Sequence, residues 1–159
     1  MGREIAPVLL RGVAAGVAAS IVQAMIGKTE EKLLLPPREN SNIAPRLMAR
    51  LAADLGQTLS VVERWTLGTG FHLGYGALWG MSYALVREHH SVHPLMGGTL
   101  LAGLIYAITF SSWGGAVQTR TERPPGERTR RMTFVTASVT LGFAIPTALL
   151  YERFRGEAP

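Results

Sequence analysis

The sequence predicts an all-α fold: an integral membrane four-helix bundle with one amphipathic surface helix in its first loop. Charged residues make up only 17% of the 159 residues, and they are gathered into blocks that separate long apolar stretches. A helix needs roughly 20 apolar residues to cross a bilayer. The stretches do not alternate polar with apolar residues as membrane barrel strands do. Helices, which satisfy their own backbone hydrogen bonds, are therefore expected.

The first span is expected at residues 5–27. Arg11 interrupts it near one end, where its long side chain can reach the headgroup region. A secretory signal peptide is the competing interpretation, because Arg3 precedes an alanine-rich apolar run. The run is long for a signal peptide, so an uncleaved span is favoured. Residues 1–159 are expected to form a single membrane domain.

Three further spans are expected at residues 65–86, 94–117 and 132–151, which contain no Asp, Glu, Lys or Arg. Pro146 should kink the last of these helices, because it lacks a backbone N–H. Aromatic residues are placed near the span ends, as an interfacial belt requires, and Tyr151 is one of them.

The long first loop is expected to contain the amphipathic helix. The doublet Pro36-Pro37 should stop the first span, and Asn40 or Ser41 can cap a new helix. Apolar residues then recur at near-helical spacing over residues 42–63, with an interruption or a bend at Gly56. This helix is expected on the membrane surface or across the mouth of the bundle. A calmodulin-type partner helix is the alternative.

The distribution of Lys and Arg predicts the orientation. Loops 28–64 and 118–131 carry eleven of the sixteen Lys and Arg residues, so both loops are predicted to be cytoplasmic, with both termini outside. The net charge of +5 is spread between apolar spans rather than on a basic domain. Contact with anionic headgroups is therefore expected, and binding to nucleic acid is not.

Small residues recur every four positions in three of the spans, which lets helix backbones approach closely. Internal packing of the bundle is the favoured interpretation, and docking of a partner's helices is the alternative. The residues predicted to line these helix contacts are Gly12, Gly16, Ser20, Gly70, Gly74, Gly76, Gly80, Gly103 and Gly115.

His72 is the one ionisable residue deep in an otherwise uncharged span. Ionisable groups inside a membrane are candidates for function, and imidazole titrates near neutral pH. Together with Gln23, Glu30 and Glu31 it forms a candidate proton relay. The alternative is a neutral histidine that bonds a neighbouring helix.

Metal, cofactor and catalytic sites are not predicted. His89, His90 and His93 with Glu88 have suitable side chains for zinc, but the sequence offers no second cluster to complete a tetrahedral site. The chain has no cysteine, which excludes disulfides, cysteine-bound metals and thiol catalysis. No acid–base or nucleophile–base pair occurs at a usable spacing.

Residues 15–38 resemble the YagU-like family of bacterial inner-membrane proteins. In that family a lysine and a glutamate precede a Pro-Leu-Pro-Pro-Arg run. Here Lys28 matches in spacing and Leu35–Arg38 matches the end of the run, while Glu31 is shifted by one position and Leu34 replaces the first proline. His72 is similar to a histidine of the corresponding family helix. The resemblance implies a bacterial inner membrane, and the family's link to survival in acid favours a proton-linked role.

Two functions follow as expectations. The first is a non-enzymatic scaffold or accessory subunit of a larger membrane complex, with other membrane polypeptides or a second copy as partner. The alternative is a small channel or transporter component with proton-linked activity in acid stress.

Overall fold

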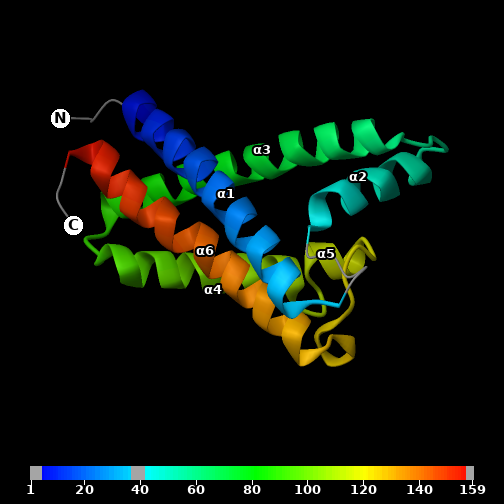
Figure 1. Cartoon of the computed structure of the whole chain (residues 1–159). Coiled ribbons are helices and arrows are strands. Elements are labelled where there is room, and N and C mark those ends of the chain that lie inside the picture. Colours follow the sequence, from blue (N-terminus) through cyan, green and yellow to red (C-terminus); the bar gives the residue numbers. More distant parts are fainter. Residues whose placement is uncertain (1–4, 37–41, 157–159) are drawn as a thin grey trace.

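The computed structural model describes residues 5–36 and 42–156, and these residues form helices and connecting loops without a strand. Four long helices dominate the fold: α1 (Ile5–Leu34), α3 (Val61–His89), α4 (Pro94–Phe110) and α6 (Arg130–Arg155). The shorter elements are α2 (Ile43–Asp54), α5 (Gly115–Gln118) and the 3₁₀ turn η1 (Pro125–Glu127). Figure 1 shows α1 and α6 side by side between α3 and α4, with α2 along α3.

Three helical segments are long and apolar enough to cross a membrane: residues 5–34, 94–118 and 130–155. In the most apolar 18-residue stretch of each segment, only 33%, 28% and 39% of the residues, in that order, are buried within the chain. Most of this apolar surface therefore needs lipid or another protein to cover it. The all-helical fold is as predicted, and three of the four predicted spans correspond to these segments. Helix α3 is 29 residues long, but His72 and its glycines lower its hydropathy, and it is not among the three.

The first helix is longer than predicted. The expected span ended at residue 27, whereas α1 continues to Leu34, two residues before Pro36. The run from Lys28 to Lys32 carries charges of both signs that can pair along a helix surface, so its charge does not end the helix. Glu30 and Glu31 consequently lie on α1 rather than in a loop.

The predicted amphipathic helix over residues 42–63 is interrupted at Gly56, one of the two outcomes expected there, and its last residues belong to α3. Helix α2 ends at Asp54, and Gly56 adopts a φ of 73°, a conformation that glycine tolerates and that reverses the chain. Ser60 then caps α3, which begins at Val61, four residues earlier than the expected second span. The Ser60 side chain accepts a hydrogen bond from the Glu63 amide, while the Glu63 carboxylate accepts one from the Ser60 amide. Hydrogen bonding of the Glu63 carboxylate to the side chain and the backbone amide of Ser60 lowers the pKa of Glu63.

Helix α2 packs on α3 rather than lying alone on a surface. A Cβ at Gly68 of α3 would come within 2.8 Å of the Pro45 backbone, so the two helices are in backbone contact there. Asn42 caps α2, with its side chain accepting from the Ala44 amide at 3.2 Å. The caps proposed at Asn40 and Ser41 lie outside the described residues.

The two later spans also differ in detail from the prediction. The third is broken, because α4 ends at Phe110 and a Ser-Ser-Trp-Gly segment separates it from α5. The fourth contains Pro146 as expected, and the hydroxyl of Thr147 donates to the carbonyl of Phe143 at 2.8 Å. Tyr151 is fully buried and packs edge-on against Tyr83, so its assignment to an interfacial belt is wrong.

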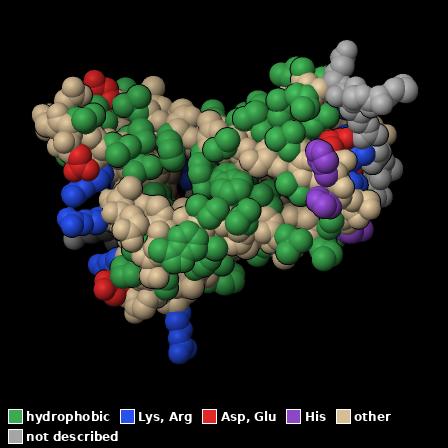
Figure 2. Space-filling model, turned by 180° about the vertical axis from the view of Figure 1, so that it is seen from behind, with side chains coloured by type: hydrophobic (Ala, Val, Ile, Leu, Met, Phe, Trp, Pro, Cys, Tyr) green, Lys and Arg blue, Asp and Glu red, His purple; other side chains and the backbone are tan. Residues whose placement is uncertain are grey.

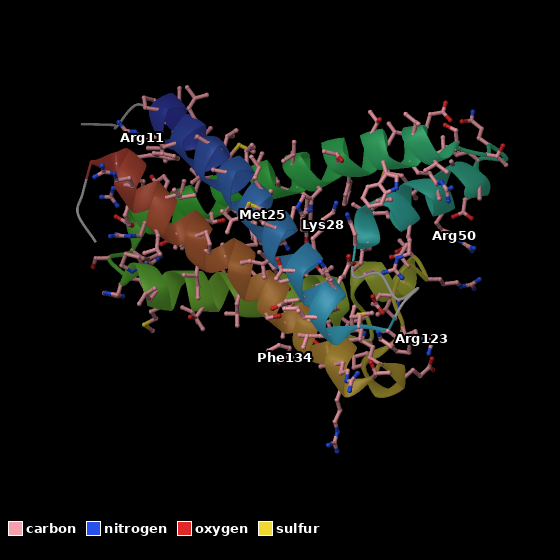
Figure 3. The ribbon with its side chains drawn as sticks, viewed as in Figure 1. Arg11, Met25, Lys28, Arg50, Arg123 and Phe134 are labelled. Atoms are coloured by element: carbon pink, nitrogen blue, oxygen red, sulfur yellow. The ribbon has the colours of Figure 1, made fainter. Side chains whose placement is uncertain are left out.

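The two ends of the molecule differ in composition. Both termini and the α3–α4 loop lie at one end, and α2, α5 and the loop before α6 lie at the other (Figure 1). From behind, histidines mark the first end and Lys and Arg side chains are prominent at the second (Figure 2). Figure 3 likewise places Arg11 at the first end and Arg50 and Arg123 at the second.

Candidate functional site

Helices α1 and α3 cross in direct backbone contact at small residues. A Cβ built on Gly12 would lie 2.6 Å from the carbonyl oxygen of Gly80, and one on Gly16 would overlap the carbonyl of Gly76. The Ser20 hydroxyl lies on the same face of α1 and donates to the Gly16 carbonyl at 2.9 Å. These five residues, all predicted to line helix contacts, therefore meet at one crossing, where a larger side chain has no room.

Four other glycines predicted to line helix contacts do not do so within the described chain. No heavy atom lies within 4 Å of a Cβ built on Gly70, Gly74 or Gly103, and a Cβ on Gly115 would only touch the Ile108 carbonyl at 4.0 Å. The α4–α6 contact uses Gly98 instead, which lies against Ile145, and Gly142 of α6 lies against the Ile26 side chain of α1. Gly98 lies four residues before Ala102 and Gly142 four residues after Ser138, but these two pairs are not among the predicted contact residues.

His72 extends the α1–α3 contact by one turn. Its Nε2 lies 3.2 Å from the carbonyl oxygen of Ser20, and the side chain is half-buried. A carbonyl oxygen only accepts, so Nε2 carries the proton in this bond. On α4, the hydroxyl of Thr109 is hydrogen-bonded to the hydroxyl of Tyr75 at 2.9 Å. His72 therefore joins α3 to α1 rather than to α4.

The other members of the candidate relay lie farther along α1. Glu30 is half-buried and accepts a hydrogen bond from the Ser138 hydroxyl of α6 at 2.7 Å. Gln23 and Glu31 are also half-buried. Ser20 and Glu30 are ten residues apart on one helix, which corresponds to roughly 15 Å. The structure thus places His72 and Glu30 at separate contacts of α1, with Gln23 between them.

The histidine-rich loop between α3 and α4 has separate local contacts. His89 bonds the carbonyl of Leu85 at 2.8 Å, and the His93 ring accepts from the Leu95 amide at the start of α4. Glu88 accepts from the Tyr151 hydroxyl at 2.9 Å. In residues 5–36 and 42–156, no three His, Cys, Asp or Glu side chains come together as a metal site.

A buried ion-pair network, which the sequence did not reveal, joins the ends of α3 and α6. Glu152 is 2% exposed, and one of its oxygens lies 2.6 Å from Nε of Arg87. Arg155 lies 3.8 Å from the other oxygen of Glu152 and 3.4 Å from Glu88. Tyr151 adds its hydrogen bond to Glu88. The network holds four charges of balanced sign at the end of the fold where the termini lie.

Comparison with known proteins gives no further assignment: no family model, no curated protein and no solved structure matches this chain.

Proposed function

We propose that this chain is an accessory subunit or scaffold of a membrane complex, that it crosses the bilayer four times, and that one face of α3 binds a partner's transmembrane helix. The supporting observation is that α3 carries glycines on two faces. Gly76 and Gly80 contact α1, whereas Gly70 and Gly74 are exposed, and no side chain or neighbouring helix in residues 5–36 and 42–156 lies within 4 Å of a Cβ added at either position.

The contacts of α3 favour a fourth membrane crossing, made by α3 itself, although the hydropathy of this helix is modest. It contacts α1 at Gly12, Gly16 and Ser20, which lie within an apolar span. The middle of α3 therefore lies at the same depth as the middle of α1. The chain must also return from the end of α1 to the start of α4, and α3 makes that return (Figure 1). Modest hydropathy is tolerated where a helix faces its neighbours rather than lipid.

The absence of cysteine allows a direct test of the fourth crossing. Single cysteines at Thr58 and Ser91, on either side of α3, should react with a membrane-impermeant maleimide from opposite sides of the membrane. A cysteine at Leu78, in the middle of α3, should react only after detergent is added. Gly126→Cys serves as a control and should react on the side of Thr58→Cys. Labelling of Thr58→Cys and Ser91→Cys from one side would show that α3 does not cross.

The exposed face of α3 is suited to close helix packing. Leu67, Phe71 and Leu78 are 49%, 40% and 54% exposed, and they flank Gly70 and Gly74 on the side away from α1. Glycine inside a helix costs about 1 kcal/mol relative to alanine in water. Small residues at this spacing let two membrane helices approach, with van der Waals contact as the main attraction. A helix from another polypeptide or from a second copy fits this face.

Larger side chains on the exposed face of α3 should prevent the partner from binding. In native mass spectrometry of protein extracted from its own membrane, the wild type should run as a complex of defined mass. Gly70→Leu with Gly74→Leu should leave the free chain, because the added side chains hold the partner's backbone away. Ala14→Leu is the control, since Ala14 is exposed on α1 and the substitution also adds volume. A free wild-type chain, or a complex that survives the Gly70/Gly74 changes, would contradict the proposal.

The resemblance of residues 15–38 to the YagU-like family supports a bacterial inner membrane as the location. The arrangement of the two basic loops, which lie at one end of the fold, supports a cytoplasmic position for both of them. Anionic headgroups are the expected lipid partners of that end.

A further inference from the structure

A charged cavity of about 510 Å³ lies where the loop between α5 and α6 folds back toward α2. Small-molecule sites commonly have about 300–1,000 Å³. Figure 3 shows Arg123 at this end of the molecule. The charged residues that line the cavity are Arg46, Arg120, Arg123, Arg128, Glu122 and Glu127.

Arg128 is the buried member of this group. Its side chain is 0% exposed, Nε donates to the carbonyl of Arg123 at 2.6 Å, and one terminal nitrogen donates to the carbonyl of Phe110 at 2.6 Å. The guanidinium also lies 5.5 Å from the centre of the Phe110 ring. The second terminal nitrogen, Nη1, has no hydrogen-bond partner among residues 5–36 and 42–156. A buried donor without a partner is costly, and Arg128 is among the residues that line the cavity, so an acceptor bound there would supply the missing partner.

Glu122 neutralises only part of the positive charge. Its carboxylate lies 3.9 Å from Arg128, accepts from the Arg123 amide at 3.0 Å, and lies 3.4 Å from Arg46. Only Glu127 then remains to balance the positive charges of Arg120 and Arg123. Four cations and two anions leave an excess of positive charge in the cavity, which an anion of one or two charges would balance.

We propose that this cavity binds a phosphate group, through Nη1 of Arg128 and the side chains of Arg120 and Arg123. The group belongs to an anionic phospholipid or to free phosphate, and both offer several charged oxygen acceptors. A lipid can approach along α6, where Phe134 is 60% exposed close to the cavity residues Thr129 and Met132. The site is independent of the helix-binding face of α3, so either proposal can fail without the other.

Calorimetric titration of the purified full chain tests the site with three probes: dihexanoyl phosphatidylglycerol, dihexanoyl phosphatidylcholine and sodium phosphate. Arg128 is left intact, because it also holds the loop together. Arg120→Gln with Arg123→Gln removes two charges that line the cavity. Arg130→Gln with Arg131→Gln is the matched control, because it removes two exposed charges from the same end that do not line the cavity.

Saturable binding should weaken about tenfold in the Arg120/Arg123 variant and less than about twofold in the control. Binding of phosphatidylglycerol alone supports the site and identifies a lipid as its source of phosphate. Binding of sodium phosphate with the same dependence on the variants supports the site for the free ion. Equal weakening in both variants would show diffuse attraction and overturn the proposal, and so would the absence of saturable binding of every probe.

Discussion

Gly16→Ala should destabilise the protein by about 3 kcal/mol, because one added carbon separates two helices in backbone contact. The new Cβ overlaps the carbonyl group of Gly76 and lies 3.1 Å from Cα of Gly80. Backbone atoms cannot rotate aside as a flexible side chain can, so α1 and α3 have to move apart. The separation also lengthens the His72 bond to Ser20, one turn farther along α1.

The loss is measured as the free energy of unfolding in mixed detergent micelles, followed by circular dichroism. Gly103→Ala is the matched control, since it makes the same chemical change in α4 where no atom lies within 4 Å of the new Cβ. Its effect should stay within about 1 kcal/mol, the difference in helix propensity between glycine and alanine. Equal losses in both variants would show that the α1–α3 contact does not hold the fold together.

The sequence was sufficient for the helices but not for their partners. Long apolar stretches predict spanning helices because the backbone has no other way to satisfy its hydrogen bonds in lipid. The repeat of small residues identified Gly12, Gly16, Gly76 and Gly80 without indicating that they meet one another. The same repeat gave equal weight to Gly70, which has no contact within the chain. Spacing identifies a helix face, and only packing decides what covers it.

The sequence contains signals for the turn between α2 and α3 that the prediction does not use. Ser60 and Glu63 have the spacing of a capping box directly before the apolar run of α3. Gly56 shortly before them is a suitable residue for a helix end. The near-helical spacing of apolar residues through this segment was misleading, because two short amphipathic stretches in sequence resemble one long one.

The pairing of Glu152 with Arg87 depends on topology that the sequence only implies. The two residues are 65 positions apart, beyond any local pattern. Helices α3 and α6 run in the same direction, so their C-terminal ends lie at the same side of the molecule, as Figure 1 shows. Opposite charges at those two ends are therefore able to meet, although no local sequence pattern pairs them.

Glu152→Gln should destabilise the protein by about 3–5 kcal/mol, because it leaves the Arg87 guanidinium buried without its counter-charge. The side chains of Glu152 and Arg87 are 3% and 15% exposed, so water replaces little of the lost interaction. Asp54→Ala is the control: its partner Arg50 lies 3.6 Å away, but the two side chains are 60% and 44% exposed. Removing this surface pair should cost less than about 1 kcal/mol.

A double variant separates the ion pair from simple packing. Replacing Glu152 and Arg87 together with methionine removes both charges and keeps apolar volume, so it should be more stable than Glu152→Gln alone. The free energies of unfolding of the three variants are compared in the same mixed micelles. If Glu152→Gln costs no more than Asp54→Ala, the network contributes little, and the ends of α3 and α6 are held by the packing of Tyr83 on Tyr151 instead.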